Sequence, residues 1–200
     1  MRGGRDGATR GARAARLAGA ILLCTAPAAA LASAPDAVGA ELDLLPTVMS
    51  AIDGEPGGAL QLWVRWGRDR LRLVGADLHY PDALTAAPFG DRQNTAVALI
   101  YDRFIQADGV GPWIAVGAEY WWSSIGLRDG AERGYWQGPV ATAGAGWIFP
   151  LWRGLYVNPW GAVHVPLKNA AVAVGAERYQ PQPLEGEVSV KLGWSQPVAP

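Results

Sequence analysis

The sequence predicts an all-β fold: an eight-stranded antiparallel up-and-down barrel that spans a membrane. The clearest strand covers residues 185–194, because side chains of a strand alternate between its two faces. One face carries Val188, Val190, Leu192 and Trp194, and the other carries Glu185, Glu187, Ser189 and Lys191. Seven further segments precede it, each about ten residues long, which is the length that a tilted membrane strand needs. A soluble barrel would bury the apolar face, whereas a membrane barrel turns it outward to lipid and keeps a polar lumen.

The first two predicted strands are residues 39–50 and 59–66. In the first, Leu42, Leu44, Pro46 and Val48 alternate with Glu41, Asp43, Leu45 and Thr47. In the second, one side carries Leu60, Leu62, Val64 and Trp66. The stretch between them, residues 53–58, is rich in Gly, Pro and acidic residues and is predicted to be a loop.

The third predicted strand, residues 71–80, changes the face on which its apolar residues lie. Leu71 and Leu73 share one parity, whereas Ala76, Leu78 and Tyr80 share the other. A β-bulge near Gly75 would reconcile the two halves, because glycine tolerates the backbone angles that a bulge needs.

The remaining strands before the closing one are predicted at residues 95–106, 112–123, 139–149 and 155–165. Residues 112–123 have the strongest pattern, with one face formed by Ile114, Val116, Ala118, Tyr120 and Trp122. None of the eight segments has the apolar period near 3.6 that an amphipathic helix shows.

The lengths of the predicted loops favour the membrane barrel. The loops after the first, third, fifth and seventh strands are long, whereas residues 67–70, 107–111 and 150–154 form turns of only four or five residues. Short periplasmic turns that alternate with longer outer loops are typical of an outer-membrane barrel. A soluble periplasmic barrel remains the alternative.

The N-terminal residues 1–34 are predicted to be a cleaved secretory signal peptide. Five arginines come first, followed by an apolar run over residues 17–31 and small residues that allow cleavage after Ala32 or Ala34. Residues 35–200 are then a single barrel domain with a short C-terminal tail. The expected location is the outer membrane of a Gram-negative bacterium.

Charge and cysteine content exclude several kinds of protein. Removal of the signal peptide takes away five arginines and one aspartate, which leaves 12 basic and 17 acidic residues and a net charge of −5. A general nucleic-acid binder would need a basic face. Cys24 leaves with the signal peptide, so no disulfide, thiol nucleophile or cysteine-ligated metal is expected.

The chain resembles the small outer-membrane β-barrels of Gram-negative bacteria, of the type of the OmpA transmembrane domain. The resemblance covers residues 39–194 and is one of architecture. Residues 188–194 look like the C-terminal assembly signal of these barrels, an alternating strand that ends on an aromatic residue, although residues 195–200 follow here. The resemblance implies no enzymatic activity. It implies outer-membrane lipids and the barrel assembly machinery as partners, and a monomeric, porin-like molecule.

The predicted lumen carries a network of charged and polar side chains. Its members are Glu41, Asp43, Arg65, Asp102, Glu119, Asn158, His164, Glu187 and Lys191. Charges in a narrow interior are costly unless they pair, so the favoured interpretation is a plugged lumen with a structural or recognition role. Glu41 and Asp43 are expected near Arg65 and Lys191, and His164 is expected opposite or diagonal to Glu187. A narrow gated path for ions or small solutes is the alternative.

An enzyme that modifies lipid A is the other alternative. His79 and His164 are the only histidines, and Ser123, Ser124 and Ser189 are the candidate hydroxyls. No spacing ties a histidine to a serine and an acid, so no catalytic residue is assigned. No cofactor or metal site is predicted, because two histidines without a cysteine make a poor zinc site.

A cluster of Arg68, Arg70 and Arg72 is expected at a solvated turn that meets lipid phosphates.

Overall fold

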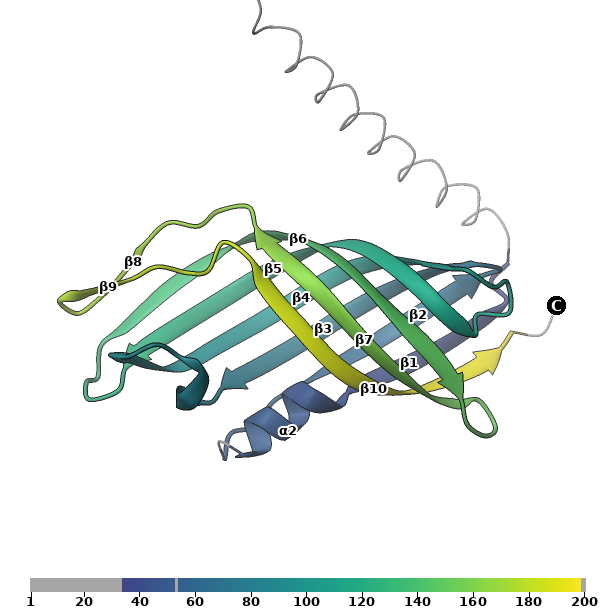
Figure 1. Ribbon diagram of the computed structural model, residues 1–200, viewed down its shortest axis with the longest axis horizontal. Coiled ribbons are helices and arrows are strands. Elements are labelled where there is room, and N and C mark those ends of the chain that lie inside the picture. The colour runs from purple at the N-terminus through teal and green to yellow at the C-terminus, as the bar shows by residue number, and fades with distance from the viewer. Residues whose placement is uncertain (1–33, 53, 199–200) are drawn as a thin grey trace, which may run out of the picture.

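In the computed structural model, which describes residues 34–52 and 54–198, eight antiparallel strands form a closed barrel (Figure 1). Each strand pairs with the next along the chain, and the last pairs with the first. The strands are β1 (Ala37–Asp43), β2 (Gly58–Trp66), β3 (Asp69–Tyr80), β4 (Phe89–Phe104), β5 (Gly111–Leu127), β6 (Arg133–Pro150), β7 (Leu155–Pro166) and β10 (Glu185–Pro197). The predicted fold is confirmed. The predicted signal peptide lies outside the described residues, apart from Ala34.

The two ends of the barrel differ. The terminal end, where β1 begins and β10 finishes, carries the connections between β2 and β3, β4 and β5, and β6 and β7. The β2–β3 turn is tightest, and Gly67 has φ +53° there, a left-handed conformation that suits glycine. The opposite end, called the loop end below, carries α2 (Leu44–Ile52), η1 (Asp82–Leu84) and a hairpin of β8 (Val172–Val174) and β9 (Glu177–Tyr179).

The first strand is shorter than predicted, because α2 replaces its second half. Pro46 explains the difference: it has no N–H for a strand ladder, but a helix tolerates proline in its first turn. The hydroxyl of Thr47 donates to the carbonyl oxygen of Asp43 (2.9 Å) across the strand–helix junction. The apolar and polar residues over 39–48 alternate as they would in a strand, and this pattern gave no indication of a helix. The prediction of a strand over residues 39–50 was therefore wrong for its second half.

The strand β3 runs without the predicted bulge. Its register is continuous against both β2 and β4. Arg70 and Arg72 face the lumen in the half of β3 nearer the terminal end, and Val74, Ala76, Leu78 and Tyr80 follow them on the same side. The change of parity in the sequence therefore reflects a lumen-facing side of β3 that turns from charged to apolar along the strand, not a slip in register.

The outer connections are shorter than predicted, so the expected alternation of loop lengths is only partly correct. Residues 89–94 belong to β4, and β5 and β6 extend until only residues 128–132 separate them. Polar side chains on both faces made these strand ends resemble loops. They continue the barrel beyond its apolar zone, where both faces tolerate polar residues. At the other end, β10 continues through Pro197 and takes up part of the predicted tail.

The outward face of the strands forms an apolar belt. Exposed apolar side chains on it include Leu42, Leu60, Leu62, Leu73, Val97, Leu99, Ile114, Trp122, Trp147, Phe149, Val163, Val188, Val190, Leu192 and Trp194. The buried side of the same strands carries Glu41, Arg70, Asp102 and Lys191. Among residues 34–52 and 54–198 there is no helix with the length and apolar character needed to cross a membrane. The barrel thus has its polar side chains inside and its apolar side chains outside.

Candidate functional site in the barrel lumen

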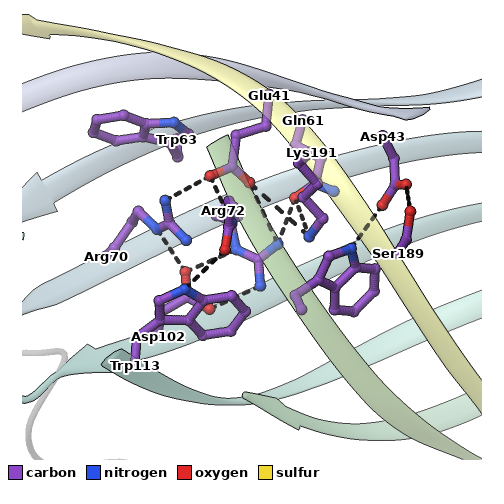
Figure 2. A network of polar contacts seen from close by, with 12 residues as sticks. Glu41, Asp43, Gln61, Trp63, Arg70, Arg72, Asp102, Trp113, Ser189 and Lys191 are labelled. Carbon is purple, nitrogen blue, oxygen red and sulfur yellow. Dashed lines mark hydrogen bonds and ion pairs between the residues drawn. The ribbon is translucent and has the colours of Figure 1, made fainter. Parts of the chain in front are cut away.

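An ion cluster fills the lumen at mid-height (Figure 2). Asp102 on β4 accepts hydrogen bonds from Arg70 Nε (2.6 Å) and from Arg72 Nε and Nη2 (both 2.8 Å) on β3. Glu41 on β1 accepts from Arg70 Nη1 (2.8 Å), and Lys191 Nζ on β10 lies 3.9 Å from its other oxygen. The side chains of Glu41, Asp102 and Lys191 are fully buried. We call these five residues, together with Asp43, the mid-lumen ion cluster.

The mid-lumen ion cluster is balanced in charge. It holds three carboxylates, of Glu41, Asp43 and Asp102, and three cations, of Arg70, Arg72 and Lys191. Asp43 accepts from Trp160 Nε1 (2.9 Å) and from the hydroxyl of Ser189. Buried charges are tolerated when they are paired and hydrogen-bonded. Every member of the cluster has at least one such contact, although Glu41 Oε2 and Arg70 Nη2 have no hydrogen-bond partner.

Aromatic rings hold the cluster in place. Arg70 lies over the rings of Phe104 (5.1 Å), Trp63 (5.5 Å) and Trp113 (5.6 Å), and Lys191 Nζ lies 3.6 Å from the ring centre of Trp160. Cations over indole faces gain a cation–π attraction in addition to their ion pairs. The indole N–H groups are also used: Trp113 donates to Asn158 (3.1 Å) and Trp63 to the hydroxyl of Tyr156 (3.0 Å). Tyr156 and Asn158 in turn donate to Glu41 Oε1 (2.8 and 3.1 Å).

The structure corrects the expected positions of three arginines. Arg65 does not meet Glu41 and Asp43; its Nη1 donates to the carbonyl oxygens of Gly67 (2.8 Å) and Ala107 (3.0 Å) at the terminal end. Arg70 and Arg72 are not at a solvated turn, since each is only 2% exposed inside the barrel. Of the predicted arginine cluster, Arg68 alone lies exposed in the β2–β3 turn. The parity of β3 was the available signal, because Leu71 and Leu73 on the opposite face mark the outward side.

A cavity of about 320 Å³ lies in the lumen on the loop side of the cluster. Arg72, Gln61 and Lys191 line its floor. Small and aliphatic side chains from β3, β4, β5 and β7 line its walls, among them Val74, Ala76, Ala96, Ala98, Ile100, Ala115 and Ala162. A second cavity of about 240 Å³ opens on the terminal side, lined by Trp63, Arg65, Arg70 and Phe104. The mid-lumen ion cluster separates the two cavities.

A second polar group, which we call the histidine cluster, lies on the wall of the larger cavity. His164 Nδ1 lies 3.1 Å from the Thr142 hydroxyl and 3.2 Å from Glu119 Oε1, and Nε2 lies 3.3 Å from Glu187 Oε2. The ladder pairs His164 with Glu185, which puts Glu187 diagonal to it. Each ring nitrogen of His164 thus lies beside a carboxylate oxygen. The Thr142 hydroxyl donates to Glu119 (2.6 Å).

The candidate catalytic serines have other partners. Ser123 donates to Asn94 (2.8 Å), Ser124 accepts from Arg133 (2.8 Å), and Ser189 donates to Asp43. The second histidine, His79, has the outward parity of β3, and its backbone N–H donates to Ser50 of α2 (3.4 Å). The histidines and serines therefore do not assemble into a nucleophile with its base.

An ion pair crosses the mouth of the larger cavity at the loop end. Arg92 on β4 donates from Nη2 to both carboxylate oxygens of Glu185 on β10 (2.7 Å each), and it lies 4.4 Å from the ring centre of Tyr80. β4 and β10 are not neighbours in the barrel, so this pair spans the lumen. The β8–β9 hairpin lies at the same end, where it contacts β5 and β6 and where Tyr179 packs against Phe89 (5.2 Å between ring centres).

Comparison with solved structures agrees with this architecture. The chain is similar to the N-terminal β-barrel domain of OprF from Pseudomonas aeruginosa, with 13% identity, 82% of this chain and 100% of that chain covered, and a TM-score of 0.50. The fold is that of the small outer-membrane barrels. The chain is also similar to Neisserial surface protein A, with 11% identity, 80% and 94% covered, and a TM-score of 0.50. No protein-family model and no curated protein sequence matches the chain. At these identities the likeness concerns the fold alone.

Proposed function

We propose that this chain is an outer-membrane barrel with a closed lumen, and that its role is structural or one of recognition rather than passage of solutes. The apolar belt supports the membrane location, because apolar side chains on the outside of a barrel are stable only against lipid or a partner of similar character. The observation that carries the closed lumen is the mid-lumen ion cluster, which divides the interior into two separate cavities.

A gated channel is less well supported than a closed barrel. Opening a path would require Asp102 to leave two guanidinium groups that together donate three hydrogen bonds to it. Parting a buried ion pair leaves uncompensated charges at a cost of roughly 3–5 kcal/mol. The Trp63 and Trp113 rings against Arg70 would have to move as well. These contacts favour a permanent plug over a gate.

Conductance of the full chain refolded into planar lipid bilayers tests the proposal. We expect the native protein to show no ion conductance. The double variant Arg70→Ala with Asp102→Ala removes one cation and one anion, keeps the cluster balanced, and should give ion-conducting events. The matched control is Asp69→Ala with Arg103→Ala, which removes an ion pair on the same two strands whose arginine side chain is 44% exposed. This control should show no ion conductance. Steady conductance by the native protein would contradict the closed lumen, and a mass shift in lipid A on incubation would support an enzyme instead.

A further inference from the structure

The wall of the barrel is incomplete beside the larger cavity. β1 ends at Asp43, which pairs with Lys191, but β10 continues to Glu185 toward the loop end. Within the portion of the chain that the structure describes, residues 185–190 of β10 have a strand partner on the β7 side only. The helix α2 packs against β10, β2 and β3 in place of a strand (Figure 1). We call the space between α2 and residues 185–190 the side gap.

The larger cavity reaches the side gap. Its lining includes Leu45, Pro46 and Met49 of α2. It also includes Gly186 and Val188 of β10, whose parity is outward, whereas the lumen-facing residues of this strand are the odd-numbered ones. A cavity inside a complete barrel wall would not touch outward residues. One hydrogen bond, from Leu45 N to the Ser189 hydroxyl (3.3 Å), links the first turn of α2 to β10.

The surface around the side gap is apolar. Val188 is 75% exposed on β10, and Val48 and Ile52 are 52% and 74% exposed on α2. The helix has the sequence LLPTVMSAI and contains no charged residue. Its exposed residues Leu44, Val48 and Ile52 are spaced by four and lie on one stripe. An uncharged helix with an exposed apolar stripe, next to the apolar belt of the barrel, fits contact with lipid hydrocarbon rather than water.

We infer that the larger cavity binds one unbranched alkyl chain, which enters from the membrane through the side gap. Its volume of about 320 Å³ is at the lower end of the roughly 300–1,000 Å³ of small-molecule sites, so it has room for one chain. The wall formed by β3 and β4 is aliphatic, whereas Glu119, His164 and Glu187 form a polar section of the wall across the lumen. The ion pair of Arg92 and Glu185 crosses the alternative entrance at the mouth. A hydrocarbon passing that pair would displace the solvation of charged groups, whereas the side gap offers it the apolar side chains of Leu45, Met49 and Val188.

This inference rests on the proposed membrane location, and photo-cross-linking separates the two. The full chain is refolded into phosphatidylcholine vesicles that carry a diazirine-labelled fatty acid or, in a second arm, a phospholipid with the diazirine on its acyl chain. Adducts are then located by mass spectrometry. On β4 we expect adducts on the outward residues Val97 and Leu99, which meet bulk lipid, and also on Ala98 and Ile100, which line the cavity. Inward adducts in either arm support an alkyl chain in the lumen, and the arm that gives them identifies its source.

Two glycine variants test the route. No atom lies within 4 Å of the position of a Cβ at Gly186 or at Gly75, so both sites accept a side chain. Gly186→Phe places a ring at the side gap and should abolish the adducts on Ala98 and Ile100 while those on Val97 and Leu99 persist. Gly75→Phe, on the outward face of β3 away from the gap, should leave both sets unchanged.

Three results would contradict these assignments in different ways. Adducts confined to Val97 and Leu99 in the native protein, in both arms, would overturn the alkyl-chain site and leave the membrane location intact. Inward adducts that survive Gly186→Phe would overturn the lateral route. Absence of adducts on Val97 and Leu99 would overturn the membrane location itself, and with it the proposed function.

Discussion

Individual residues in the lumen are held by several partners each. Asp102 accepts three hydrogen bonds from Arg70 and Arg72, and Glu41 Oε1 accepts from Arg70, Tyr156 and Asn158. Such side chains cannot be removed one at a time without leaving a charge unpaired in a buried place. The partners that remain decide the cost of a substitution here.

The first prediction concerns Asp102, whose removal leaves two buried guanidinium groups without their shared carboxylate partner. Asp102→Ala should lower the free energy of unfolding by about 3–5 kcal/mol, as expected for breaking a buried ion pair. Arg103→Ala, one position along the same strand, breaks the more exposed pair with Asp69 and should cost only about 0–1 kcal/mol. Urea titration of the refolded protein in lipid vesicles measures both. Equal costs for the two variants would show that the cluster does not stabilise the barrel.

At the scale of elements, the sequence predicts strands well where one face is uniformly apolar and poorly where both faces have the same polarity. β5 and β10 belong to the first kind, and their alternation is unbroken. The prediction of the first strand was wrong beyond Asp43. The alternation of Leu with acidic residues ends there, and the chain continues as an uncharged helix that contains Pro46. Arg70 and Arg72 were misplaced because the lumen becomes apolar halfway along β3, which imitates a bulge. The polarity of the lumen at a given height depends on side chains from several strands, so the sequence of one strand cannot predict it.

The helix α2 depends on close packing against the chain that follows it. A Cβ at Gly57 would overlap the hydroxyl of Ser50 and lie 2.8 Å from the carbonyl oxygen of Asp77. Gly57→Ala should therefore push α2 away from the barrel and cost about 1–3 kcal/mol, the usual range for overpacking. Amides of residues 44–52 should exchange hydrogen faster, which mass spectrometry can follow. Gly75→Ala, where a Cβ meets open space, should leave their exchange unchanged; faster exchange there too, or none in Gly57→Ala, would contradict the packing.

At the scale of the whole molecule, glycine makes room for the aromatic lumen. A Cβ at Gly39 would overlap the ring of Trp63, one at Gly146 the ring of Trp113, and one at Gly193 the ring of Tyr156. Eight strands enclose an interior that side chains just fill, so each large inward ring needs a small residue beside it. At these three positions glycine and the large ring beside it therefore meet one packing requirement.

The central claim is that the apolar outer face of this barrel meets lipid, and an arginine scan along one strand tests it most directly. Val190, near mid-length of β10, and Gln196, near its terminal end, both face outward. In a bilayer, Val190→Arg should lower the free energy of unfolding by about 2–4 kcal/mol and Gln196→Arg by about 0–1 kcal/mol, because the cost of a charge depends on its depth. If the two variants cost the same to within about 0.5 kcal/mol, as exposed sites in water do, the outer face does not lie in a membrane.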